Sequence, residues 1–116
     1  MKELKFEKPN VEEIFIYNFC KSRILSLTAL SYIRLDKTSK AREQLDVVKN
    51  FLQTSLDVSH SNFILYYKAE ARYYLSIKNY AKAKKYVYQF LDNISINTHS
   101  LYYIDFNLLL AEILNA

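Results

Sequence analysis

The sequence predicts an all-α fold in which about five helices form antiparallel hairpins, and three observations support this class. The 116 residues include no glycine and a single proline, Pro9, whereas strand-rich folds depend on tight turns that usually need those two residues. Apolar residues recur at three- and four-residue spacing, and no segment keeps the strict alternation of a strand. The chain is 51% hydrophobic and 24% charged, as expected for a globular protein.

The first helix is expected over Val11–Leu35. Asn10 precedes it and can cap its N-terminus, and Glu12 and Glu13 suit the partial positive charge of a first helical turn. The polar segment "DKTS" ends this helix.

Four more helices follow, each separated from the next by a short polar segment. The breaks are "DVSHSN" after the second helix, "KN" after the third and "NISINTHS" after the fourth. The expected bounds are Ser39–Leu56, Asn62–Ile77, Tyr80–Ile94 and His99–Asn115.

We expect these helices to form one domain, because the chain length is that of a single domain. It comprises residues 1–116, with a flexible N-terminus over 1–10, a first hairpin over 11–56, a second over 62–94 and a terminal helix over 99–115.

The two hairpins match each other when the sequence is shifted by 42 residues. Small and aromatic residues then coincide, with larger apolar residues at matching places. The matched pairs include Ala29 with Ala71, Tyr32 with Tyr74, Ala41 with Ala83, Leu45 with Val87 and Val48 with Phe90.

The order of these residues resembles the tetratricopeptide repeat, over about residues 22–94. That motif places a small residue and an aromatic in its first helix, then an aromatic, a small residue and two larger apolar residues in its second. The second hairpin has Ala71, Tyr74, Tyr80, Ala83, Val87 and Phe90 in this order. The last helix would open a third unit.

The sequence departs from that family in its period and its turns. The family repeats every 34 residues and this chain every 42, glycine is missing near the turns, and Thr38 stands where an aromatic is expected. A plain helical bundle built from two hairpins is therefore the alternative.

The resemblance implies a non-catalytic module that binds a protein or peptide in a groove, as in the sensing part of a bacterial regulator. In such arrays one stripe of each first helix lines the groove, here Leu65, Lys68, Arg72 and Leu75, with Arg23, Ser26, Leu30 and Ile33 as their counterparts. Among these counterparts Arg23 would add a further cation to the groove. From the last helix we expect Tyr102 and Phe106 as apolar anchors. These cations favour an acidic partner.

Catalysis and metal binding are not expected. Without glycine there is no phosphate-binding loop, and His60 and His99 have no metal-ligand spacing, so no cofactor is predicted. Cys20 lies in mid-helix beside an apolar stripe, which predicts a small buried side chain.

Two other functions stay open: a small inhibitor or immunity-type protein that blocks one partner, and a nucleic-acid-binding helical domain. The second rests on "KNYAKAKKY", where lysines interleave with Tyr80 and Tyr86, although a solvated helix surface explains this pattern better.

The compartment and the assembly state are also predicted. The charged N-terminus does not resemble a signal peptide, no apolar run approaches the roughly 18 residues of a membrane span, and the one cysteine suits a reducing compartment. We therefore expect a cytoplasmic protein. The last helix is apolar nearly all round, which predicts self-association through it.

Overall fold

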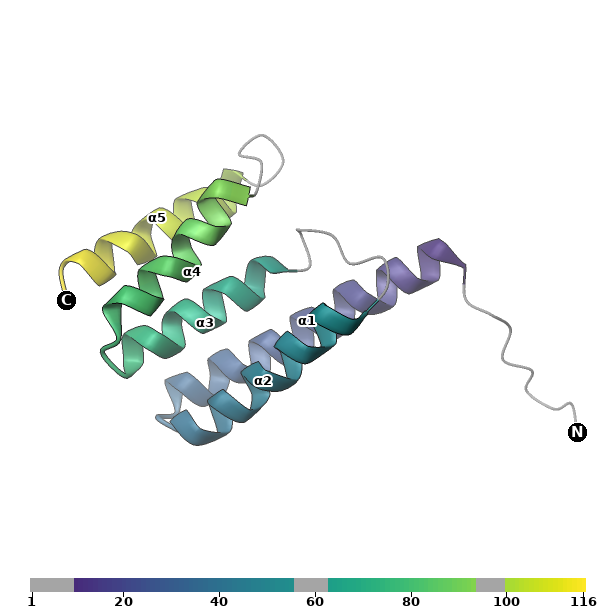
Figure 1. Cartoon of the computed structure of the whole chain (residues 1–116), viewed down its shortest axis with the longest axis horizontal. Helices are drawn as coiled ribbons and strands as arrows, with labels where there is room; N and C mark the ends of the chain where they lie inside the picture. The colour runs from purple at the N-terminus through teal and green to yellow at the C-terminus, as the bar shows by residue number, and fades with distance from the viewer. Residues whose placement is uncertain (1–9, 56–62, 94–99) are drawn as a thin grey trace, which may run out of the picture.

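The computed structural model describes residues 10–55, 63–93 and 100–116. This part of the chain holds five helices and no strand, which confirms the all-α class (Figure 1). The helices are α1 (Val11–Arg34), α2 (Thr38–Thr54), α3 (Ile64–Ser76), α4 (Tyr80–Asn93) and α5 (Ser100–Leu114).

The helix ends that the structure describes lie within two residues of the predicted ones. The predicted N-cap is confirmed, because the Asn10 side-chain oxygen accepts a hydrogen bond from the Glu13 backbone N–H at 2.8 Å. Residues 1–9 of the N-terminus that we predicted to be flexible lie outside the described residues, as do His60 and the predicted ends at Leu56, Asn62, Ile94 and His99.

The helices pair in chain order as two antiparallel hairpins followed by α5 (Figure 1). α1 packs against α2 and α3 packs against α4, while α3 also contacts α1 and α2. α5 lies against α4 and touches α3. α3 thus makes the main contacts between the first hairpin and the rest of the described fold.

The hairpin turns are equivalent at the predicted shift of 42 residues. The first helix of each hairpin is followed, in the turn, by a residue in the left-handed region. These residues are Asp36 with φ 57° and Lys78 with φ 62°. In both turns the next backbone N–H reaches back over the last helical turn, as in a Schellman motif. These bonds are Lys37 N to Tyr32 O at 2.9 Å and Asn79 N to Tyr74 O at 2.8 Å.

Burial follows the same correspondence. Both members of the pairs Ala29–Ala71, Ala41–Ala83, Leu45–Val87 and Val48–Phe90 are fully buried. All of them except Ala41 belong to two core clusters, one in the first hairpin together with Tyr66 and Ala69, the other in the second hairpin together with Phe106, Leu109 and Ile113. Small side chains at the first two pairs let each hairpin's helices approach closely.

The middle of α1 buries polar side chains. Asn18, Ser22 and Ser26 are buried there, and the Ser26 hydroxyl has no hydrogen-bond partner among the described residues. Cys20 is exposed, so its predicted burial is wrong. On a helix, residues 18, 22 and 26 share one face and residue 20 points roughly 160° away from it.

Lys78 offers a test of the turn geometry. A non-glycine residue with positive φ costs about 1 kcal/mol, so Lys78→Gly should raise the free energy of unfolding by about 0.5–1 kcal/mol. The measurement is urea denaturation followed by circular dichroism. The matched control is Lys49→Gly in the exposed interior of α2, which should lower stability by about 1 kcal/mol. Destabilisation by both variants would contradict the proposed strain at Lys78.

Candidate functional site

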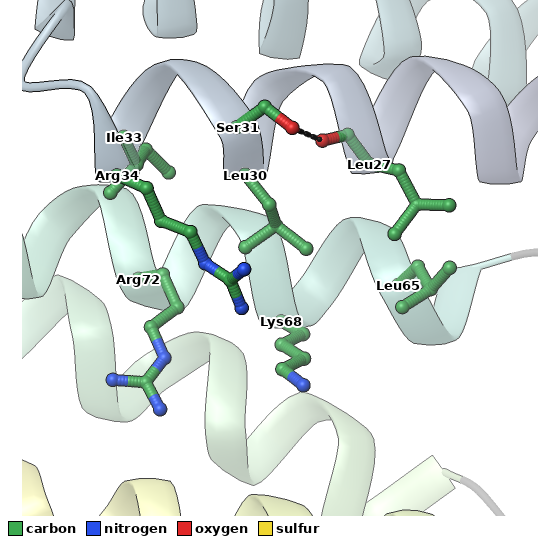
Figure 2. A pocket seen from close by; sticks show the side chains of 8 residues that line it. All are labelled: Leu27, Leu30, Ser31, Ile33, Arg34, Leu65, Lys68 and Arg72. Carbon is green, nitrogen blue, oxygen red and sulfur yellow. Dashed lines mark hydrogen bonds between the residues drawn. The ribbon is translucent and has the colours of Figure 1, made fainter.

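A groove of about 520 Å³ runs between α1 and α3 (Figure 2). It combines aliphatic side chains with three cations. The lining residues are Leu27, Leu30, Ser31, Ile33 and Arg34 from α1 and Leu65, Lys68 and Arg72 from α3.

The groove exists because two neighbouring helices present matching residue types to one side. Along α1 the spacing of Leu27, Leu30 and Arg34 keeps these side chains on one face, and Lys68 and Arg72 are one turn apart on α3. Ser31 turns its hydroxyl to the Leu27 carbonyl at 3.0 Å and so presents little polarity to the groove (Figure 2).

Two of the three cations are held by carboxylates of α5. The Lys68 ammonium lies 2.6 Å from Asp105, and the Arg72 guanidinium lies 2.7 Å from Glu112. All four side chains are partly exposed, so these pairs can exchange with a ligand or with salt. Arg34 has no ion pair among the described residues.

The structure brings only part of the predicted ligand-binding set to the groove. Leu65, Lys68 and Arg72 line it, and so do Leu30 and Ile33, which the repeat had placed as counterparts on α1. Ser26, the counterpart of Lys68, is fully buried instead and does not line the groove.

The other predicted binding residues lie elsewhere. Arg23 donates a hydrogen bond to the Tyr102 hydroxyl at 3.3 Å, linking α1 to α5. Leu75 is half-buried against the second core cluster. Phe106 is fully buried and stacks on Phe90 with ring centroids 4.0 Å apart, so it occupies the core rather than an accessible surface.

The lining residues that sequence reasoning missed are Leu27, Ser31 and Arg34. The signal was present, because residues 23, 27, 30 and 34 follow helical spacing. The 42-residue shift predicted positions 26 and 33 in place of 27 and 34 on α1. It gave no reason to choose Arg34, because the residue 42 positions later is the uncharged Ser76.

A second cluster is buried between α2 and α3. Glu70, only 1% exposed, forms an ion pair with Arg42 at 2.8 Å and accepts a hydrogen bond from the Tyr66 hydroxyl at 3.1 Å. Arg42 also pairs with Asp46 at 2.9 Å, and its guanidinium lies 4.9 Å from the centre of the Tyr73 ring. The cluster therefore satisfies a buried carboxylate with a cation and a phenol from different helices.

Titration of this cluster is shifted by burial and by its charges. Burial alone would lower the pKa of the Arg42 guanidinium, but hydrogen bonds to Glu70 and Asp46 and their charges raise the pKa overall. Burial, followed by the Glu70 charge, raises the pKa of Tyr66. Burial and a hydrogen bond to Glu70 raise the pKa of Tyr86, and burial raises that of Tyr67.

These shifts keep the phenols of Tyr66, Tyr67 and Tyr86 protonated and the Arg42 guanidinium charged at neutral pH, since each raised pKa lies further above neutrality. A general acid or base needs a pKa near the working pH. These four side chains are thus suited to holding the helices together rather than to proton transfer at neutral pH.

A smaller hollow of about 260 Å³ lies on the α2–α4 side of the fold. It includes Lys85 and Tyr86 from "KNYAKAKKY", with Lys49 opposite them on α2. Its volume is below the roughly 300–1,000 Å³ of typical small-molecule pockets. Within the described segments no three His, Cys, Asp or Glu side chains are grouped as a metal site requires.

Comparison of the chain with protein-family models, with curated proteins and with solved structures gives no match. The candidate site is therefore judged on its geometry. No helix among the described residues is long and apolar enough to cross a bilayer.

The buried ion pair predicts a non-additive mutant cycle. Arg42→Met leaves the Glu70 carboxylate buried without its cation and should cost about 3–5 kcal/mol of stability. The double variant Arg42→Met, Glu70→Leu removes both charges and should recover most of that loss. Urea denaturation measures both. Asp46→Asn, which removes the exposed partner of Arg42, should cost under about 1 kcal/mol. A double variant less stable than Arg42→Met would contradict this assignment.

The buried phenols predict a loss of stability in alkali. Their pKa values are raised in the fold, so above about pH 10 the unfolded chain binds fewer protons than the folded chain. The free energy of unfolding should then fall with rising pH, by up to about 1.4 kcal/mol per pH unit for each such tyrosine.

Urea denaturation from about pH 8 to about pH 11 measures this slope. Tyr66→Phe should make it shallower, whereas Tyr88→Phe, at an exposed position, should leave it unchanged. An unaltered slope in Tyr66→Phe would show that Tyr66 is not one of the groups responsible.

Proposed function

We propose that this chain is a non-catalytic helical module that binds an acidic segment of another protein in the groove between α1 and α3. The observation that carries the proposal is the combination of an aliphatic floor with Arg34, Lys68 and Arg72 from two helices. A peptide with carboxylates beside aliphatic side chains would match both features.

The cations give the groove orientation and selectivity. Arg34 has no carboxylate partner among the described residues, so it is the first contact for an incoming carboxylate. Lys68 and Arg72 already face Asp105 and Glu112, so a ligand must compete with two carboxylates of the chain itself. A neutral peptide that breaks these ion pairs forms none in return. An acidic peptide replaces each broken ion pair with one between its own carboxylate and the same cation.

We also propose kinship with tetratricopeptide-repeat proteins. It is supported by the equivalence of the two hairpins in turn geometry and burial at a constant shift. On this basis the chain would act as an interaction module, such as the sensing part of a bacterial regulator, working in the cytoplasm. Self-association through α5 belongs to the same proposal.

Peptide selection tests the groove. The protein, immobilised by a terminal tag, is panned against a phage-displayed library of random linear peptides, and selected peptides are synthesised with a fluorophore for anisotropy titration. We expect acidic-aliphatic sequences whose affinity falls with salt, because exposed charges are screened. Arg34→Glu should weaken binding at least tenfold, a change of about 1.4 kcal/mol.

Lys49→Glu is the matched control, since it makes the same charge change on the opposite side of the fold. It should bind the selected peptides as the wild type does. Equal loss in both variants would mean that binding follows net charge alone, and loss only in Lys49→Glu would move the site to the α2–α4 side. A fluorescent single-stranded oligonucleotide, titrated in parallel, should not bind; tight binding that Lys49→Glu abolishes would favour the nucleic-acid function instead.

A further inference from the structure

α5 carries an uncovered apolar stripe on the side away from the core. Leu101, Ile104 and Leu108 are 79%, 60% and 66% exposed. Their spacing of three and four residues puts them on one face of the helix, opposite the buried Phe106, Leu109 and Ile113. We refer to Leu101, Ile104 and Leu108 as the α5 stripe.

The earlier hairpins show what normally covers such a face. α1 is covered by α2 around Ala29, and α3 is covered by α4 around Ala71. α5 packs mainly against α4 and α3, with one hydrogen bond from Arg23 of α1 to its Tyr102, and no described element covers the α5 stripe. The first helix of each hairpin is thus covered by a following helix, and α5 has the apolar residues for one more.

We propose that the α5 stripe pairs with the α5 stripe of a second copy of this chain, as an antiparallel two-fold dimer. This deepens the self-association contained in the proposed function by naming the surface and its symmetry. In such a pair, the Leu101 of one copy would lie near the Leu108 of the other, with both copies of Ile104 near the two-fold axis, and each helix would cover the α5 stripe of the other.

The distribution of charge favours a second copy over a charged partner. A two-fold interface brings a surface patch against itself, so any net charge on it would be opposed by the same charge. The α5 stripe has none, and its flank at Asn107 and Ala111 is neutral. On the other flank Asp105 and Glu112 are already paired with Lys68 and Arg72. The internal ion pairs therefore remove the like-charge repulsion that would otherwise oppose pairing.

The size of the surface sets the expected strength. From Leu101 to Leu108 the helix rises about 10 Å, which is short for an interface of the standard size of about 1,600 Å². The dimer should therefore be weak, with a dissociation constant on the order of 10–100 μM.

The opposite end of the array poses a rival arrangement. Ile24 on α1 is 63% exposed, and Val47 on α2 is 51% exposed. Head-to-tail association would place this end of one copy on the α5 stripe of the next. Its interface would then join two different surfaces, whereas the two-fold dimer joins two α5 stripes.

Sedimentation equilibrium of the full chain from about 10 μM to about 1 mM, which brackets the expected dissociation constant, separates these arrangements. Ile104→Glu should be monomeric throughout, and Ile24→Glu, the same change at an equally exposed apolar residue, should dimerise like the wild type. Circular dichroism checks that both variants are folded. Mixing the two variants should give no dimer beyond that of Ile24→Glu alone.

Three results would overturn the proposal: a wild type that stays monomeric up to 1 mM, dimerisation that Ile104→Glu does not reduce at least tenfold, or association that both variants lose and their mixture restores. The last outcome is the signature of head-to-tail contact, because each variant keeps one intact end. Peptide binding is measured separately on monomeric Ile104→Glu, so failure of the dimer and failure of the groove remain distinguishable.

Discussion

The ion pair between Arg42 and Glu70 is the constraint on which the arrangement of the two hairpins depends. Each hairpin can bury its own small and aliphatic residues, and among the described residues α3 makes the main contacts of the second hairpin with the first. Burying Glu70 would be costly without Arg42 and the Tyr66 hydroxyl, so this carboxylate admits few positions of α3 relative to α2. With α3 set in this way, its opposite face meets α1 and leaves the groove between Leu30 and Leu65.

Two further ion pairs connect α3 to α5. Lys68 and Arg72 leave α3 on the groove side and reach Asp105 and Glu112, while Phe106 and Ile113 anchor α5 in the core of the second hairpin. The apolar contacts supply the stability, since partly exposed ion pairs contribute little. The buried side chains Phe106, Leu109 and Ile113 fix the rotation of α5 about its axis, and this rotation directs Leu101, Ile104 and Leu108 outward.

Local signals in the sequence predicted the fold well, whereas contacts between distant helices were out of reach. Asn10 and the turn breaks depend on neighbours within a few residues, and the 42-residue correspondence compares two such local patterns. The helix ends and the equivalent turns at Asp36 and Lys78 agree with these signals. Glu70 looked like any surface acid, because its partner lies 28 positions away in the chain. Ser26 and Phe106 were misplaced because a repeat read from sequence gives the face of a helix only to within a residue, which is about 100° of rotation. The sequence therefore predicted Leu65, Lys68 and Arg72 as groove residues, but it did not predict Leu27, Ser31 and Arg34.

Two ion pairs connect the groove to the flank of the α5 stripe, since Lys68 and Arg72 line the groove and their partners Asp105 and Glu112 lie beside the stripe. This gives the two proposals a joint consequence. A ligand carboxylate that takes Arg72 releases Glu112, and one that takes Lys68 releases Asp105. Both released carboxylates flank the α5 stripe, and a two-fold dimer would bring each of them into the field of its counterpart. Acidic ligands should then oppose pairing, and by thermodynamic linkage pairing should weaken those ligands by the same factor. Such a chain would report the presence of an acidic partner as a change from dimer to monomer without any rearrangement of its helices.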